Sequence, residues 1–438
     1  MLPLILKNIS WLASFRAFEL LISLTIGIWL VRYLGPSDFG LFSYVIAIGA
    51  LMSPFIGLGV PNILSRELLL APNKRNTIIG TAFWIWFISG FIGFVALNIL
   101  AFLLKPTDVE SLILVFVFSL TFVVQAFGVV AGIFESRLQS KLCVKSAIWS
   151  IVISNVIKVL LIVFSFPVLF FIIVSLIETI IRIAFMVYYY FKIGERISDW
   201  KWDYSFAVKM IKSSWPLMFS GVMVVLYMKI DQVMIGLMLG DYQLGLYSVS
   251  VKLAEIAYFL PGVIMLSLFP SLMSLKKLGG EKYLQRIKLM FSFMTYFPFI
   301  LIVPVLLLSQ FIVTFLYGVE YLGASVALSV SIFSLWAVFV KSGVDSYLLC
   351  ENKTKIIFIG SLIGAISNIL LNLILIPLYG IVGAALATVF SYALAAYVGV
   401  LFSRKTWPIF LILLESFDPR LLINSILKLY NNEFKLKK

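Results

Sequence analysis

The chain has 438 residues, of which 62% are hydrophobic and only 12% are charged, and its formal net charge is +14. Soluble domains usually carry about 25% charged residues, so a soluble core could not bury this much apolar surface. The composition excludes a soluble globular protein and predicts an all-α polytopic membrane protein.

Twelve stretches are long and apolar enough to span a membrane, since a span needs about 20 mostly apolar residues. In chain order they are 9–32, 41–60, 78–104, 111–133, 146–166, 168–190, 213–239, 242–270, 289–317, 323–349, 356–378 and 383–403. No small-residue cleavage site follows the opening MLPLILKNIS, so we expect the first span to be retained.

The links between these spans alternate in length and charge. Links after odd-numbered spans are very short, whereas the others, together with the terminal segments, hold most of the 34 lysines and arginines. By the positive-inside rule, both termini are expected in the cytoplasm. The same charges suit contacts with anionic lipid headgroups. Nucleic-acid binding is the weaker interpretation, because no soluble domain is available for it.

One turn occurs twice in the sequence. LGPSDFGLFS, from Leu34, and LGDYQLGLYS, from Leu239, share the pattern LG-x4-GL-aromatic-S and follow the first and seventh spans. This predicts two parallel six-helix halves related by an axis along the membrane normal, with chance convergence of Gly-rich turns as the alternative. The predicted parts are lobes at 1–191 and 213–403, a cytoplasmic linker at 192–212, and a basic tail at 404–438. The tail is expected to form an amphipathic helix on the membrane surface, with disorder as the alternative.

Three segments carry a resemblance to a known family. VRYLGPSDFGLFSYVIAIGA, DQVMIGLMLGDYQLGLYSVSVKLAE and LNLILIPLYGIVGAALATVFSYALA resemble recurring segments of the polysaccharide and oligosaccharidyl-lipid exporters. The resemblance implies a V-shaped, two-lobed transporter without a cofactor. It also implies an O-antigen-type flippase that carries undecaprenyl-pyrophosphate-linked sugars across a bacterial inner membrane. The implied partners are this lipid-linked sugar, membrane lipids, a polysaccharide polymerase and a chain-length regulator.

Eleven ionisable residues fall inside the predicted spans. Each costs at least about 2.5–3.5 kcal/mol at a helix centre that faces lipid, so most must face protein or water. Eight form pairs spaced i,i+3 or i,i+4, which places both partners on one helix face. These pairs are Arg16/Glu19, Glu178/Arg182, Lys252/Glu255 and Lys341/Asp345, and the other three residues are Lys158, Lys229 and Asp231.

Basic side chains in a wet cavity would attract a pyrophosphate, with Arg as a bidentate donor and Lys as a mobile charge. The candidates for this role are Arg16, Lys229 and Lys252, followed by Lys341 and Arg182. The acids Glu19, Asp231, Glu255, Asp345 and Glu178 would balance charge or couple transport to H⁺ or Na⁺, because the chain has no GxxxxGK[ST] phosphate loop. Alternatively, each pair only lets its helix insert and locks helix packing, and Lys158 has no partner on its own helix.

Four helix-breaking residues are the expected hinges or gates: Pro261 and Pro270, which share a span with Lys252, and Gly35 and Gly240 in the repeated turn.

The alternative functions are a multidrug exporter of the same superfamily, a peptidoglycan-precursor flippase, and a membrane polysaccharide polymerase. The intramembrane bases argue against the first, because such exporters expel mostly cationic drugs. The short outer links argue against an enzyme. The chain has no histidine, the commonest general base and metal ligand. Cys143 and Cys350 lack metal-ligand spacing, so neither a catalytic residue nor a metal site is expected.

Overall fold

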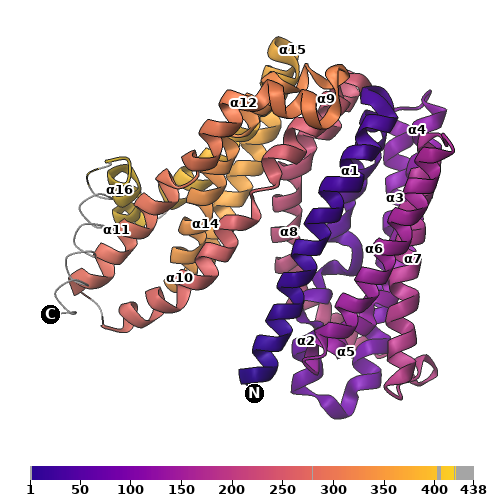
Figure 1. The fold of residues 1–438 in the computed structure, drawn as a ribbon. Helices are drawn as coiled ribbons and strands as arrows, with labels where there is room; N and C mark the ends of the chain where they lie inside the picture. The colour runs from indigo at the N-terminus through magenta and orange to yellow at the C-terminus, as the bar shows by residue number, and fades with distance from the viewer. Residues whose placement is uncertain (1, 279, 402–405, 419, 421–438) are drawn as a thin grey trace. The chain divides into compact units, whose positions relative to one another are not determined.

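The computed structural model describes residues 2–278, 280–401, 406–418 and 420. Side chains are not described for part of the first helix and for a few residues beside position 279. Within these ranges the chain forms helices joined by short links, and it contains no strand (Figure 1). Ten helical stretches of the described chain are long and apolar enough to cross a membrane. The expected all-α polytopic membrane fold is therefore confirmed.

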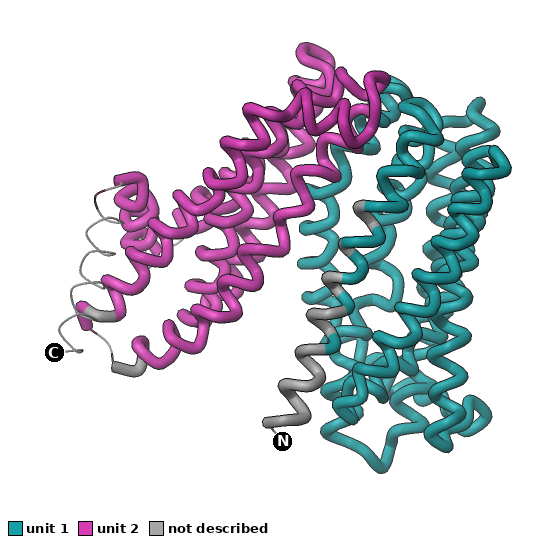
Figure 2. Tube along the Cα trace, in the orientation of Figure 1, with its two compact units in different colours: residues 1–245 teal, residues 246–438 magenta. Residues whose placement is uncertain are grey.

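The chain divides into two compact units, residues 1–245 and 246–438 (Figure 2). The helices of the first unit are α1 (Leu2–Met52), η1 (Ser53–Gly59), α2 (Pro61–Leu70), η2 (Pro72–Lys74), α3 (Arg75–Leu104), α4 (Val109–Val124), η3 (Gln125–Val130), α5 (Ala131–Ser136), α6 (Ser140–Val163), α7 (Val168–Lys192), η4 (Ile197–Asp199), α8 (Tyr204–Met238) and the start of α9 (Asp241–Glu255). The first unit thus includes α8, which begins at Tyr204, inside the linker expected at 192–212. The division into two six-helix lobes stays a prediction.

The second unit contains the rest of α9 and seven further α-helices within its described residues. They are α10 (Phe259–Leu278), α11 (Gly280–Tyr296), α12 (Phe299–Tyr317), α13 (Ala324–Ser331), α14 (Ser334–Cys350), α15 (Thr354–Leu401) and α16 (Trp407–Glu415), with the 3-10 turn η5 (Val319–Tyr321) before α13. The tail expected at 404–438 contains α16, which packs through the buried Ile409, Ile412 and Leu413. Residues 421–438 of this tail lie outside the described chain.

Two of the ten membrane stretches, Thr25–Leu70 and Thr354–Leu401, each cover residues of two expected spans. In α15 the helix breaks at Gly380, where φ is 59° and ψ is −138°. Its two arms then run antiparallel in close contact, with backbones meeting at Gly360 and Gly399, and with Asn368 Nδ2 donating to Ser391 Oγ at 3.0 Å. This long helix is therefore a hairpin of the spans expected at 356–378 and 383–403.

The first helix breaks in the same way at Gly35, where φ is 69° and ψ is 174°. Before the break, Tyr33 Oη donates to the carbonyl of Phe166 in the link between α6 and α7, at 2.8 Å. After it, the chain reaches the middle of α3, where the Gly57 N–H donates to Ser89 Oγ at 2.8 Å. The two sides of Gly35 correspond to the spans expected at 9–32 and 41–60.

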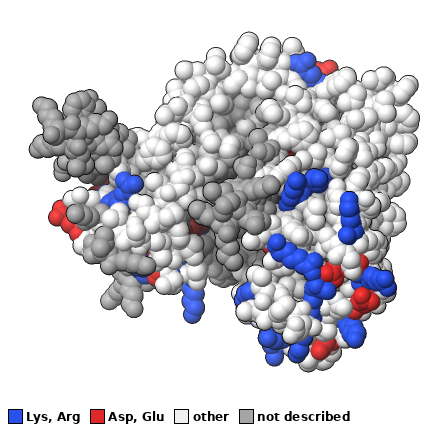
Figure 3. All heavy atoms as spheres, turned by 60° about the horizontal axis from the view of Figure 1, so that its bottom comes forward, with Lys and Arg blue, Asp and Glu red and all other residues white. Residues whose placement is uncertain are grey.

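Three of the basic links meet at one end of the first unit. Glu195, after α7, forms ion pairs with Arg75 at the start of α3, at 2.9 Å, and with Arg137 after α5, at 2.7 Å. On the face shown in Figure 3, lysines and arginines gather at this end, while most of the remaining surface lacks charged side chains. The structure thus places these basic links on one side, as the positive-inside pattern requires.

The two copies of the repeated turn pack against each other near the opposite end of the first unit. A Cβ added at Gly40 would lie 1.7 Å from the carbonyl oxygen of Asp241, and one added at Gly245 would lie 1.9 Å from that of Pro36. Gly40 and Gly245 occupy equivalent positions in the two copies, as do Pro36 and Asp241. The contact is therefore pseudo-symmetric, as in an isologous interface, and only glycine fits at either crossing.

We expect Gly245→Ala to lower the melting temperature in detergent, because an added methyl group in a closely packed site costs about 1–3 kcal/mol. The control is Gly262→Ala on α10, where an added Cβ would meet nothing within 4 Å. Equal melting temperatures for the two variants would contradict the close crossing.

Candidate functional site

A cluster of charged side chains joins α6 to α7 inside the membrane helices of the first unit. Glu178 Oε2 lies 3.3 Å from Lys158 Nζ and accepts a hydrogen bond from Ser154 Oγ at 2.8 Å. Its other oxygen, Oε1, lies 3.5 Å from a terminal guanidinium nitrogen of Arg182. One carboxylate thus stands between two cations.

Helix spacing brings these groups together. The contact between Glu178 and Arg182 is the i,i+4 pair expected from the sequence. Lys158 has no partner on its own helix, and its carboxylate comes from the neighbouring α7. α6 and α7 run side by side, which places the three charges at one level.

The cluster lies well inside the membrane region. At a rise of about 1.5 Å per residue, Arg182 is about 21 Å from the first residue of α7 and about 15 Å from its last. Charges at this depth face protein or water because lipid cannot solvate them. Only 17% of the Lys158 side chain and 21% of that of Glu178 are exposed, compared with 41% for Arg182.

The cluster carries an excess of positive charge and an unused donor. Two cations share one carboxylate, and Arg182 Nε is buried without a hydrogen-bond partner among the described residues. A guanidinium with free N–H groups can bind a phosphate oxygen through two parallel hydrogen bonds. The arrangement can therefore bind an anion in a region otherwise filled by apolar side chains.

The other candidates of the first unit lie on α1 and α8. Asp231 is only 1% exposed, and its Oδ1 accepts the N–H of Gln232 at 2.7 Å. Lys229 and Glu19 are half-buried. The side chain of Arg16 lies outside the described part of α1, so its expected contact with Glu19 and its phosphate role stay predictions.

The second unit holds a closed ion pair on α14. Lys341 Nζ lies 2.6 Å from both carboxylate oxygens of Asp345, four residues further along the helix. This is the pairing expected from the i,i+4 spacing, and it leaves the carboxylate fully engaged with one cation. Lys252 and Glu255 are half-buried at the end of α9.

The expected bend near Pro261 is a break in the helix. The span expected at 242–270 divides into α9, which ends at Glu255, and α10, which begins at Phe259. Pro261 is buried in the first turn of α10, whereas Pro270 lies exposed within that helix. Gly35 and Gly240, the other expected hinges, have φ values of 69° and 84°. Movement at these positions stays a prediction.

A buried polar network on α15 was not expected from the sequence. Asn372 Nδ2 donates to Asn368 Oδ1 at 2.9 Å, and the hydroxyls of Tyr247 on α9 and Thr388 lie 3.4 Å apart. Asn372 Oδ1 is buried without a partner within the described structure. Two asparagines four residues apart in the apolar run SNILLNL were the available signal, because such side chains join membrane helices by hydrogen bonds.

No group of three or more Cys, Asp or Glu residues comes together in the described chain in a way that could hold a metal ion. Cys143 and Cys350 are both free thiols.

A family model described as "Polysaccharide biosynthesis protein" matches residues 29–326. A "Probable flippase AglR" of Haloferax volcanii is 26% identical over 184 residues, which are 40% of this chain and 37% of that protein. The chain thus aligns with little more than a third of the length of this curated relative.

Solved transporters share the fold. An inward-facing multidrug resistance MATE family transporter of the MOP superfamily superposes with a TM-score of 0.67 at 15% identity, covering 88% of this chain and 93% of that one. The lipid II flippase MurJ in an inward closed conformation gives a TM-score of 0.64 at 20% identity, covering 94% and 92%. At such identities the likeness concerns the fold alone.

We expect Glu178→Gln to lower the melting temperature, because it leaves Lys158 and Arg182 without their shared carboxylate, and a buried charge that loses its partner is strongly destabilising. Adding Lys158→Gln should recover part of the loss, since one fewer charge is then uncompensated. Thermal unfolding in detergent measures both effects. Glu320→Gln, at an exposed position of η5, is the control. An equally stable Glu178→Gln variant would contradict the cluster.

Proposed function

Because the chain belongs to the polysaccharide biosynthesis protein family, we propose that it is a flippase for a sugar chain joined to a polyprenyl pyrophosphate. The observation that carries the proposal is the cluster of Lys158, Glu178 and Arg182, with its excess positive charge inside the membrane helices. The similarity to a probable flippase and the fold shared with a lipid II flippase support it.

The chemistry of such a substrate explains why a transporter would hold charge at this depth. A pyrophosphate is the part of the lipid-linked sugar that hydrocarbon excludes most strongly, and the polyprenyl chain is the part that it accepts. Arg182 has one buried N–H, at Nε, without a partner among the described residues, and Glu178 neutralises one of the two cations. An arriving phosphate would compete with Glu178 for the same donors.

We propose that Arg16, Lys229 and Lys252 contact the pyrophosphate at other stages of transport, and that Glu19 and Glu178 balance charge. Lys341 is held by both oxygens of Asp345, so it contributes only if this pair opens. Coupling to H⁺ or Na⁺ would then fall to Asp231, Glu255 or Asp345.

The setting that we propose follows from the charge pattern and the family. The basic links that meet at Glu195 would face the cytoplasm of a bacterium, with both termini on the same side of the inner membrane. The substrate would be an undecaprenyl-pyrophosphate-linked repeat unit such as an O-antigen. A polysaccharide polymerase and a chain-length regulator would receive the exported unit. We propose a transport role without catalysis.

Flipping of a defined lipid-linked sugar in proteoliposomes tests the proposal. We expect Arg182→Gln to slow protein-dependent flipping by about 10- to 100-fold, since a hydrogen bond to a charged group contributes about 1.5–3 kcal/mol. The control is Arg66→Gln on α2, whose side chain is 57% exposed and pairs with the adjacent Glu67.

Two results would count against this function. Full flipping by Arg182→Gln would remove the cluster from the substrate path. Transport of small organic cations in place of the lipid-linked sugar would assign the chain to the multidrug exporters that share its fold.

A further inference from the structure

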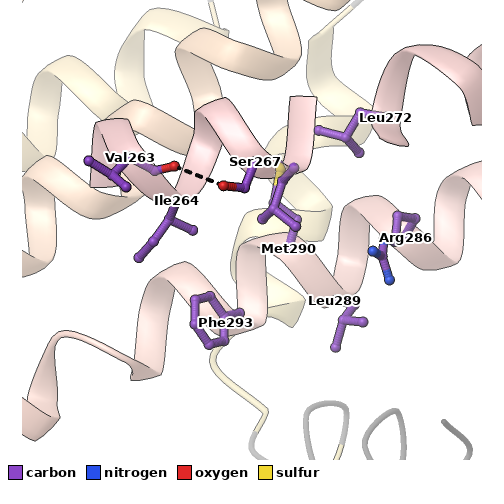
Figure 4. A pocket seen from close by; sticks show the side chains of 9 residues that line it. Val263, Ile264, Ser267, Leu272, Arg286, Leu289, Met290 and Phe293 are labelled. Atoms are coloured by element: carbon purple, nitrogen blue, oxygen red, sulfur yellow. Dashed lines mark hydrogen bonds between the residues drawn. The ribbon is translucent and has the colours of Figure 1, made fainter. Parts of the chain in front are cut away.

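A groove of about 370 Å³ lies between α10 and α11 in the second unit (Figure 4). Its lining is almost wholly apolar and includes Ile264, Leu268, Met290 and Phe293. Ser267 also lines the groove, but its hydroxyl already donates to the carbonyl of Val263 at 3.3 Å. Both helices belong to stretches that are apolar enough to cross a membrane, so lipid is the medium around them.

The polarity of the groove changes along its length. Arg286, near the start of α11, and Leu272, near the end of α10, mark one end, while Val263 and Phe293 mark the other (Figure 4). The charged end is the one next to the basic connection between α10 and α11, and the apolar end lies deeper along both helices. This gradient matches a lipid in one leaflet, with its headgroup near the surface and its chain towards the midplane.

Arg286 is the charged side chain of this lining, and its charge is uncompensated within the described structure. It is half-buried and pairs with no described residue, whereas two nearby lysines have partners. Lys276 Nζ donates to the carbonyl of Cys350 at 2.6 Å, and Lys288 Nζ lies 2.6 Å from a carboxylate oxygen of Glu415. The guanidinium is therefore available to a ligand at the mouth of an apolar groove.

We propose that this groove binds an anionic phospholipid, with the phosphate on Arg286 and one acyl chain along α10 and α11. A guanidinium binds a phosphate through two hydrogen bonds, and an anionic headgroup is further attracted to the basic end of the helices. A peptide would fit poorly, because its backbone N–H groups need acceptors, and the lining of the groove has no carboxylate or amide side chain. The proposal does not depend on the transported substrate.

Native mass spectrometry of the purified protein with phosphatidylglycerol or phosphatidylcholine tests this site. The wild-type chain should bind phosphatidylglycerol more tightly, and Arg286→Gln should weaken that binding by about tenfold, as expected for the loss of a charged hydrogen-bond donor. Lys288→Gln is the matched control, because it removes a base from the same helix that already has a carboxylate partner.

Two further variants separate the groove from the charge. Leu289→Trp fills the groove and should weaken the binding of both lipids, whereas Leu266→Trp, at a side chain that is 77% exposed on α10 and outside the lining, should not. The proposal is overturned if Arg286→Gln keeps the wild-type affinity for phosphatidylglycerol. It is equally overturned if the two tryptophan variants, or the two charge variants, lose affinity to the same extent. None of these outcomes bears on flipping, which is measured through Arg182.

Discussion

The contact on which this account depends is the carboxylate of Glu178 held between Lys158 and Arg182. Hydrocarbon cannot solvate a charge, so each ionised group within a membrane helix must find a partner or water. Lys158 finds its partner on the neighbouring helix, and this fixes how α6 and α7 pack at that level. Because two cations share one carboxylate, the same contact that stabilises the empty protein leaves positive charge for a substrate.

A second constraint is the crossing of the two repeated turns. The backbone carbonyls of Asp241 and Pro36 occupy the space that side chains at Gly40 and Gly245 would need. Each glycine faces the partner copy of the turn, so the duplicated sequence LG-x4-GL describes two sides of one pseudo-symmetric contact. Beside it, Lys105 Nζ lies 3.0 Å from Asp241 Oδ1 and 4.6 Å from the centre of the Tyr44 ring. The repeated motif thus forms a packing interface. This structural role explains the positions of the glycines within each copy and requires no catalytic function.

Much of this fold could be predicted from the sequence, because apolar length and charge asymmetry are properties of single segments. The spans, the reversals at Gly35 and Gly380, and the pairs Glu178/Arg182 and Lys341/Asp345 follow from local spacing. Contacts between helices cannot be predicted from local spacing. Nothing near Lys158 in the sequence points to Glu178, twenty residues away, and the groove at Arg286 exists only because α10 and α11 pack antiparallel. The break between α9 and α10, in contrast, lies just before Pro261, one of the helix breakers expected from the sequence.

The most direct test of the central claim is a binding measurement with purified protein that compares a polyprenyl pyrophosphate with the corresponding polyprenol. The two ligands share their hydrocarbon chain and differ in the phosphates, so the ratio of their dissociation constants isolates recognition of the charge. We predict tighter binding of the pyrophosphate by the wild-type chain, and a much smaller ratio when Lys158 and Arg182 are both replaced by Met. An unchanged ratio in that double variant would show that the phosphates are recognised elsewhere, and the cluster would then be a structural contact between α6 and α7.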